Sequence, residues 1–255
     1  MMRKILSLLL LISTTTLLCL AQSKVVGYEL KKVPSDCSSY DNPLLQKELD
    51  KSKKKLEKQT SIVIGYCPET MVSKMPQSPL SNFLTDILVD IANEYCQKHH
   101  KDSVDFSLLN FGGIRSSLKA GNITIGNIFE IAPFENSLVI ADIKGSELRK
   151  VFLRFKVKDC QPYSQQVSIQ YVGDYLHRVY IHGQKIDNDK IYRMVTLDFI
   201  LTGGDDILKD IEIGHVEHTG IVVRNAYINH IKKMTAEGKN ITGKRDQRMT
   251  ILPQP

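Results

Sequence analysis

Apolar residues recur at helical spacing between residues 79 and 99, and this pattern predicts a helix that is buried on a wide face. Ser78 is a favourable N-cap, because its hydroxyl can accept a hydrogen bond from the first helical turn. Pro79 suits the first helical position, where no backbone donor is needed. The apolar positions are Phe83, Leu84, Ile87, Leu88, Ile91, Ala92 and Tyr95.

Residues 42–58 predict a second helix with a single apolar stripe at Leu45, Leu49 and Leu56. Its remaining surface is rich in lysine, and we interpret that lysine run as a solvated helix face. The lysines are Lys51, Lys53, Lys54, Lys55 and Lys58.

Short apolar runs predict strands, and a hairpin is expected across the turn Gly173-Asp174. Helices and strands alternate without a regular βαβ repeat, so the fold class is predicted as α+β, a mixed sheet with packed helices. The expected strands are residues 24–33, 61–66, 104–109, 138–143, 166–172, 176–182 and 191–196, and the further helices are residues 126–131 and 145–155.

The N-terminus has the features of a signal peptide. Arg3 and Lys4 precede the apolar stretch Ile5–Leu20, small residues follow it, and we expect a mature chain that begins at Gln22. A retained membrane anchor is disfavoured, since the stretch falls short of the ~20 continuous apolar residues that a span needs. A lipid-modified Cys19 is a weaker alternative. The sequence therefore predicts an exported protein, periplasmic or secreted, with no transmembrane span in the mature chain.

The formal net charge is +6, and the loss of Arg3 and Lys4 with the signal peptide (residues 1–21) leaves +4. No face or stripe collects the charge, so we expect no nucleic-acid partner. The length of 255 residues fits one domain with an extension. We expect residues 22–60 to hold an N-terminal strand and the Lys-rich helix, and residues 61–255 to form the domain.

Four cysteines follow the signal peptide, and in an oxidising compartment they permit up to two disulfides with three possible connectivities. No Cys/His spacing indicates zinc. Cys96 lies on the apolar face of a predicted helix, so an inert buried thiol is at least as good an interpretation for it. The four are Cys37, Cys67, Cys96 and Cys160.

The first candidate site segment is the run from Asn110 to Arg115, which directly follows a predicted strand. Gly112 and Gly113 let the backbone approach a ligand closely, and their N–H groups can line an anion site. The planar guanidinium of Arg115 can grip a phosphate or a pair of hydroxyls. Taken alone, such a segment is more often a structural turn.

Two further segments place an aromatic ring after a turn or a strand. Phe134 follows Pro133, and Asn136 can present a donor and an acceptor to a base edge. Phe199 stands six residues before Asp205. Each Phe alone is more often a core residue, but together two rings can sandwich a flat base, and stacking is worth ~1–3 kcal/mol per base.

The spacing of these segments resembles the C-terminal domain of the 5'-nucleotidase family. The run NFGGIRSSLKAGNITIGNIFEIAPFENSLVIADIKGSEL is similar to the family pattern Asn-x-Gly-Gly-x-Arg, Gly-x-Ile-Thr, Pro-Phe-x-Asn and Gly-x-x-Leu, and residues 199–205 match Phe-x-x-x-Gly-Gly-Asp. The resemblance covers roughly residues 40–215. Two departures are Ser81, where the family has glycine in Leu-Gly-Asn, and Lys74, where family members often carry an arginine.

The resemblance implies a substrate site for a nucleotide or nucleoside in this chain. Phe134 and Phe199 would clamp the base, and Asn136 would read its edge. Asp205 would bind the ribose, while Asn110 and Arg115 would hold sugar or phosphate. The expected substrate-binding residues are Lys74, Asn110, Gly112, Gly113, Arg115, Phe134, Asn136, Phe199 and Asp205.

In this family, a separate N-terminal domain performs hydrolysis with two metal ions, which clamp the attacking and leaving oxygens. None of the seven histidines of this chain stands in the family's metal motifs Asp-x-His or Gly-Asn-His-Glu. We interpret His215 and His218, framed by Gly214 and Gly220, as loop residues with a solvated or structural role. We therefore expect no catalytic residue and no cofactor in this chain.

The chain ahead of residue 40 is too short for such a domain, and two interpretations follow. The first is the substrate-recognition half of a split 5'-nucleotidase in nucleotide catabolism, with a divalent metal pair in a separately encoded metallophosphatase. The second is a free-standing exported protein that binds a nucleotide or nucleoside without catalysis. A Ser/His or Cys/His hydrolase finds no support, since no Gly-x-Ser-x-Gly motif is present. UDP-sugars, NAD and cyclic phosphodiesters remain possible ligands beside purine nucleotides.

Overall fold

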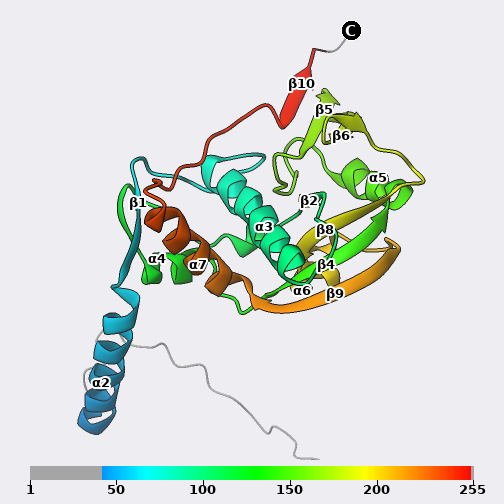
Figure 1. The fold of residues 1–255 in the computed structure, drawn as a ribbon. Helices are drawn as coiled ribbons and strands as arrows, with labels where there is room; N and C mark the ends of the chain where they lie inside the picture. Colours follow the sequence, from blue (N-terminus) through cyan, green and yellow to red (C-terminus); the bar gives the residue numbers. More distant parts are fainter. Residues whose placement is uncertain (1–41, 254–255) are drawn as a thin grey trace, which may run out of the picture. The chain divides into compact units, whose positions relative to one another are not determined.

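The computed structural model describes residues 42–253, and its elements are labelled in Figure 1. The expected signal peptide, the expected strand 24–33 and Cys37 lie outside these residues. The chain divides into two compact units between Asp50 and Lys51, inside helix α2 (Pro43–Thr60). No side chain of α2 is buried, which matches the expected helix with a solvated lysine face.

One mixed sheet has the strand order β2-β8-β4-β9 (Figure 1). β8 pairs parallel with β2 and antiparallel with β4, and β4 pairs antiparallel with β9. Consecutive residues 138–141 of β4 are all buried, so both faces of the sheet are covered. The strands are β2 (Phe106–Ser107), β8 (Ile191–Leu197), β4 (Ser137–Lys144) and β9 (Ile213–Val222).

A second mixed sheet has the order β10-β5-β6-β7. β5 and β6 form the expected hairpin, and β10, near the C-terminus, pairs parallel with β5. With the two-stranded sheet β1-β3, the architecture confirms the predicted α+β class. The bounds are β5 (Val167–Val172), β6 (Tyr175–Ile181), β7 (Gln184–Lys185), β10 (Met249–Leu252), β1 (Val63–Cys67) and β3 (Gly121–Thr124).

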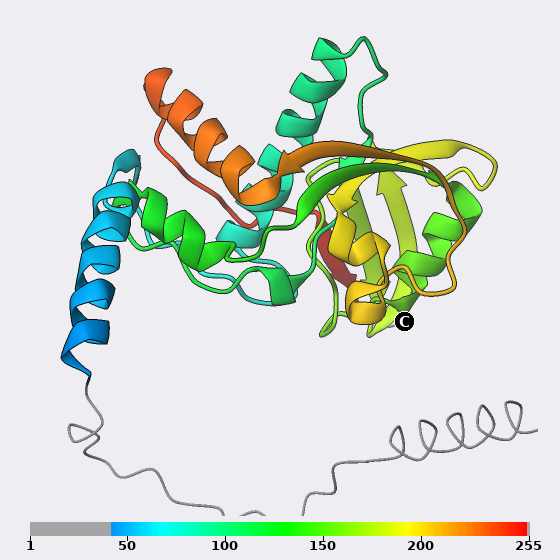
Figure 2. The ribbon, with the colours of Figure 1, turned by 90° about the horizontal axis from the view of Figure 1, so that it is seen from below.

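Helix α3 (Pro79–Lys98) is the buried helix that the sequence predicts, and it packs against β2, β8 and α7 (Val223–Ala236). Ser78 caps it as expected, with its hydroxyl accepting from the backbone N–H of Ser81. Figure 2 shows β9 leading directly into α7. The other helical segments are α4 (Ile125–Ile131), α5 (Gly145–Arg154), α6 (Asp198–Leu201), η2 (Phe111–Gly113) and η3 (Gly204–Asp206). No helix within residues 42–253 has the length and apolar character needed to cross a membrane.

Two sequence interpretations are corrected by the structure. The expected strand 104–109 is shorter in the structure: β2 comprises Phe106–Ser107, and Leu108 forms an isolated bridge with Tyr163. His215 and His218 lie on strand β9 and not in a loop. Both side chains are exposed, and the pairing of β9 with β4 is irregular between Ile213 and Val216.

The described cysteines Cys67, Cys96 and Cys160 are buried free thiols. Cys96 is therefore the inert buried thiol considered from the sequence. Burial raises the pKa of Cys160 to about 12, which keeps it protonated and unreactive.

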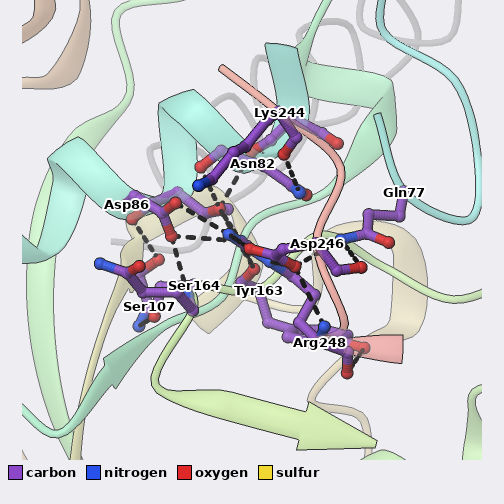
Figure 3. A network of polar contacts seen from close by, with 12 residues as sticks. Gln77, Asn82, Asp86, Ser107, Tyr163, Ser164, Lys244, Asp246 and Arg248 are labelled. Carbon is purple, nitrogen blue, oxygen red and sulfur yellow. Dashed lines mark hydrogen bonds and ion pairs between the residues drawn. The ribbon is translucent and has the colours of Figure 1, made fainter. Parts of the chain in front are cut away.

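A buried arginine ties the C-terminal segment to α3 (Figure 3). The Arg248 side chain is 3% exposed, and its Nη2 donates to Asp86 on α3 at 2.8 Å and to Asp246 at 2.7 Å. Its Nη1 donates to the carbonyl of Tyr163 at 2.8 Å. Burial alone would raise the pKa of Asp246, but its hydrogen bonds with Arg248 hold that pKa below its ordinary value. The network fixes the N-terminal half of α3 against the loop that precedes β5.

Replacing this arginine tests the network. Arg248→Met leaves two carboxylates without their cation, and we expect the free energy of unfolding at pH 7 to fall by about 3 kcal/mol. This is the lower end for a broken buried pair, because both carboxylates are about a quarter exposed. The difference from the parent should shrink as the pH falls below about 4, because both carboxylates then become protonated: Asp86, whose pKa burial raises, before Asp246, whose pKa lies below its ordinary value.

Chemical denaturation of both proteins measures this difference. Lys53→Met is the control, because Lys53 forms only an exposed pair with Glu57 at 4.0 Å and should change stability by less than about 0.5 kcal/mol. Equal stability of Arg248→Met and the control would show that the network contributes nothing.

Candidate functional site

A cleft with about 510 Å³ of open space lies at one edge of the sheet β2-β8-β4-β9. Its lining comes from the segment after β2, the segment before β4, and α6 with η3 after β8. The lining residues are Asn110, Gly112, Gly113, Arg115, Phe134, Asn136, Phe199 and Asp205.

The strand register explains why these distant segments meet. Leu138 at the start of β4 lies opposite Leu197 at the end of β8, because the two strands are antiparallel. β2 is parallel to β8, and its last residue Ser107 lies opposite Val195. The start of β4 and the ends of β2 and β8 therefore share one edge of the sheet, and the segments attached there form the cleft.

The floor of the cleft is closed by one hydrogen bond. Asn110, which is 4% exposed, donates from Nδ2 to Oδ2 of Asp205 at 2.7 Å. Two glycines make room for this pair: a Cβ at Gly113 would stand 2.8 Å from Oδ1 of Asn110, and one at Gly112 would stand 3.2 Å from Oδ2 of Asp205. Within the described part of the chain, Oδ1 of Asn110 is buried without a hydrogen-bond partner.

Phe134 lies on the segment between α4 and β4 and is 48% exposed. The segment is fixed at both ends, because Ala132 donates to the carbonyl of Ile128 and Val223 donates to the carbonyl of Asn136 at 3.0 Å. The ring is therefore held at the cleft by its backbone while its own faces remain accessible.

Phe199 is 42% exposed and belongs to the short helix α6, where the sequence predicts a strand end. A Cβ at Gly204 would overlap the Phe199 ring, so the ring lies directly over the backbone of that glycine. Asp205 next to it has φ 54°, a left-handed conformation that is uncommon for residues other than glycine. The turn thus carries both a seat for the ring and a carboxylate in the cleft.

Arg115 provides the positive charge of the cleft. Its backbone N–H donates to the carbonyl of Ile131 at 2.9 Å, which fixes the segment after η2 beside α4. Its exposed side chain donates from Nη1 to the carbonyl of Gly112 at 3.3 Å. The guanidinium stands where it can meet an anionic group of a ligand.

The cleft brings together eight of the nine residues that the sequence predicts for substrate binding. The ninth, Lys74, is exposed in the loop between β1 and α3 and does not line the cleft. No cluster of three or more His, Cys, Asp or Glu side chains that could hold a metal ion lies within residues 42–253.

Two residues that shape the cleft are absent from the sequence prediction. One is Gly204, which lies in the motif of residues 199–205 but is not among the predicted substrate-binding residues. The other is Arg224 on α7, which lies behind the Phe134 segment and contacts it through Pro133 and Glu135. No local pattern marks this arginine, because its partners lie 91 and 89 positions away in the sequence.

The family model described as 5'-nucleotidase, C-terminal domain matches residues 63–210. Protein UshA from Yersinia enterocolitica is 35% identical over 133 residues, which are 51% of this chain and 24% of UshA. The trifunctional nucleotide phosphoesterase protein YfkN from Bacillus subtilis is 27% identical over 225 residues, covering 80% of this chain and 15% of YfkN.

Among solved structures, the 5'-nucleotidase precursor from Thermus thermophilus superposes with a TM-score of 0.64. The superposition covers 83% of this chain and 44% of that one, at 22% sequence identity, and it supports the fold. This chain spans about a quarter or less of the two curated relatives that it matches.

The contact between Gly204 and the Phe199 ring predicts that a substitution at Gly204 lowers ligand affinity without lowering stability. In Gly204→Ala, the new methyl group displaces the exposed Phe199 ring, and we expect adenosine to bind about 10-fold more weakly, as for a lost stacking ring. The free energy of unfolding should change by less than about 0.5 kcal/mol, because an exposed ring can move without disturbing the core.

Calorimetric titration and thermal unfolding measure the two effects. Gly183→Ala is the matched control: it has open space around its Cβ position but φ +74°, so it should lose stability and keep its affinity. Full adenosine affinity in Gly204→Ala would contradict this seat.

Proposed function

This chain belongs to the family of 5'-nucleotidase C-terminal domains, and on that premise we propose that it is the substrate-recognition part of a split 5'-nucleotidase. It binds a purine nucleotide or nucleoside between Phe134 and Phe199. A separately encoded metallophosphatase domain then performs the hydrolysis.

The pair of half-exposed phenyl rings on one cleft carries this proposal. Phe134 is 48% and Phe199 is 42% exposed, although each is large and apolar. Both line the same cleft and come from segments more than sixty residues apart in the sequence. A flat base stacked between them would remove one face of each ring from water, and each stacked ring contributes ~1–3 kcal/mol of binding free energy.

The polar residues around the rings suit the rest of a nucleotide. Asp205 keeps one carboxylate oxygen beyond its bond from Asn110, and a carboxylate accepts well from ribose hydroxyls. The Arg115 guanidinium supplies charge for a phosphate. The cleft therefore offers a complementary group for base, sugar and phosphate.

The hydrolytic half of the proposal rests on the family. YfkN, which the chain matches in part, is named a trifunctional nucleotide phosphoesterase. Hydrolysis of a phosphomonoester by a metal pair needs a dense set of carboxylate, imidazole and amide ligands. We assign that pair to the partner domain, and we assign to this chain the binding and orientation of the substrate.

The proposal places this activity outside the cytoplasm. The N-terminal pattern of Arg3, Lys4 and the apolar stretch to Leu20 is typical of a signal peptide. Export would put the domain where nucleotides are degraded to nucleosides for uptake, as a step of nucleotide catabolism.

Ring removal tests the binding site. We expect Phe134→Ala and Phe199→Ala each to weaken the binding of AMP and adenosine by about 5- to 150-fold, because each variant loses one stacking surface. Tyr175→Ala is the control, because that tyrosine is 80% exposed on β6 and outside the cleft. Calorimetric titration of the parent, the control, the two single variants and the double variant measures the change. A double alanine variant that binds both ligands as well as the parent would exclude this site.

Phosphate release tests the division of labour. We expect the purified chain with Mn²⁺ to release no phosphate from AMP while it binds AMP in the same sample. Addition of a metallophosphatase domain should restore release, and that release should depend on Phe134. Metal-dependent turnover by this chain alone would refute the split, and binding that no added domain converts into release would favour a free-standing binding protein.

A further inference from the structure

Arg224 is a buried cation directly behind the cleft. It is the second residue of α7 and is 7% exposed. It does not line the cleft between the rings, and it lines an adjoining apolar recess together with Phe134 and Asn136.

Its contacts converge on the segment that carries Phe134. Nη1 donates to the carbonyl of Pro133 at 2.9 Å, and Nη2 donates to Oε1 of Glu135 at 3.1 Å. The neighbouring backbone N–H of Val223 donates to the carbonyl of Asn136 at 3.0 Å. The start of α7 thus binds the residues on both sides of Phe134 and leaves its ring free.

The guanidinium has a third contact, which connects the segment to α4. Its central carbon lies 4.2 Å from the centre of the Phe129 ring, a distance typical of a stacked cation–π pair. A planar guanidinium can stack and donate in two directions at once, whereas the single ammonium group of lysine cannot reproduce this geometry.

The position of this arginine is unfavourable for the helix itself. The N-terminal end of a helix carries a partial positive charge, so a cation in the first turn of α7 is repelled by the helix dipole. Glu135, its ion-pair partner, is 82% exposed and compensates the buried charge only in part. The contacts with the Phe134 segment and with the Phe129 ring offset this cost, while Nε of Arg224 has no hydrogen-bond partner among the described residues.

We infer that Arg224 is a positioning residue that holds the Phe134 ring at the angle needed to stack on a base. This rests on the proposed function for its effect on affinity, and on the contacts alone for its effect on the segment. A half-exposed ring has few packing contacts of its own, so its direction depends on the backbone of residues 133–136. Arg224 fixes that backbone from outside the cleft.

The first test uses the protein without ligand. In Arg224→Met, ¹⁵N relaxation and amide exchange should show increased motion at Phe134–Asn136, while the amides of the main sheet stay as in the parent. Arg224→Lys should order the segment only in part. Asn225→Ala, at the exposed neighbouring position of α7, is the control and should leave the segment unchanged. An equally rigid segment in Arg224→Met would overturn the inference, whether or not the protein binds a nucleotide.

The second test is a double-mutant cycle in adenosine affinity. Arg224→Met should weaken adenosine binding about 10-fold in the parent. In the Phe134→Ala background, where the ring through which Arg224 acts is absent, the same substitution should weaken binding by less than about 2-fold. A factor that is equal in both backgrounds would assign Arg224 a general structural role and overturn the inference. If Phe134→Ala itself leaves affinity unchanged, the proposed function fails, and the first test still decides the role of Arg224.

Glu135→Ala provides an alternative test in case Arg224→Met does not fold. Glu135→Ala removes the contact at Nη2 from an exposed side chain and keeps the buried cation in place. It should increase the backbone motion of residues 133–136. It should also weaken adenosine binding in the parent but not in the Phe134→Ala background. Unchanged motion and unchanged affinity in Glu135→Ala, together with the same result for Arg224→Lys, would overturn the inference.

Discussion

The cleft depends on holding two phenyl rings in water at a fixed separation. Neither Phe134 nor Phe199 is positioned by burial of its own ring, since each is close to half exposed. Each is positioned instead from behind: the Phe199 ring lies on the backbone of Gly204, and the Phe134 segment is bound by Arg224 at the start of α7. Preorganisation of this kind lowers the entropic cost of binding, because the rings need not be ordered when the ligand arrives.

The mixed sheet brings segments that are distant in the sequence together at one cleft. The antiparallel register of β4 and β8 and the parallel register of β2 and β8 bring one end of each strand to the same edge. The hydrogen bond from Asn110 to Asp205 then joins the segment after β2 to the turn after α6. The rigid part of the protein thus lies in the sheet and α3, which Arg248 ties to the C-terminal segment. The residues that line the cleft lie on the short connections at the ends of these strands.

The sequence predicted the residues of the cleft better than the elements around it. Eight of nine expected residues meet there, because the joint spacing of the segments is specific even where each alone is ambiguous. Helix α3 was predictable from its apolar period and its cap. β9 was not, since Gly214, His215 and Gly220 interrupt any alternation. Arg224 was not either, because its role exists only once α7 is packed behind α4, a tertiary relation without a local pattern.

One measurement tests the central claim most directly: ¹⁹F NMR of the protein labelled with 4-fluorophenylalanine during titration with adenosine. The chain has eight phenylalanines, and single Phe→Tyr variants assign their signals. The account predicts that the signals of Phe134 and Phe199 shift together, with one common dissociation constant, because both rings stack on the same base. A titration in which adenosine binds and neither signal moves would contradict it.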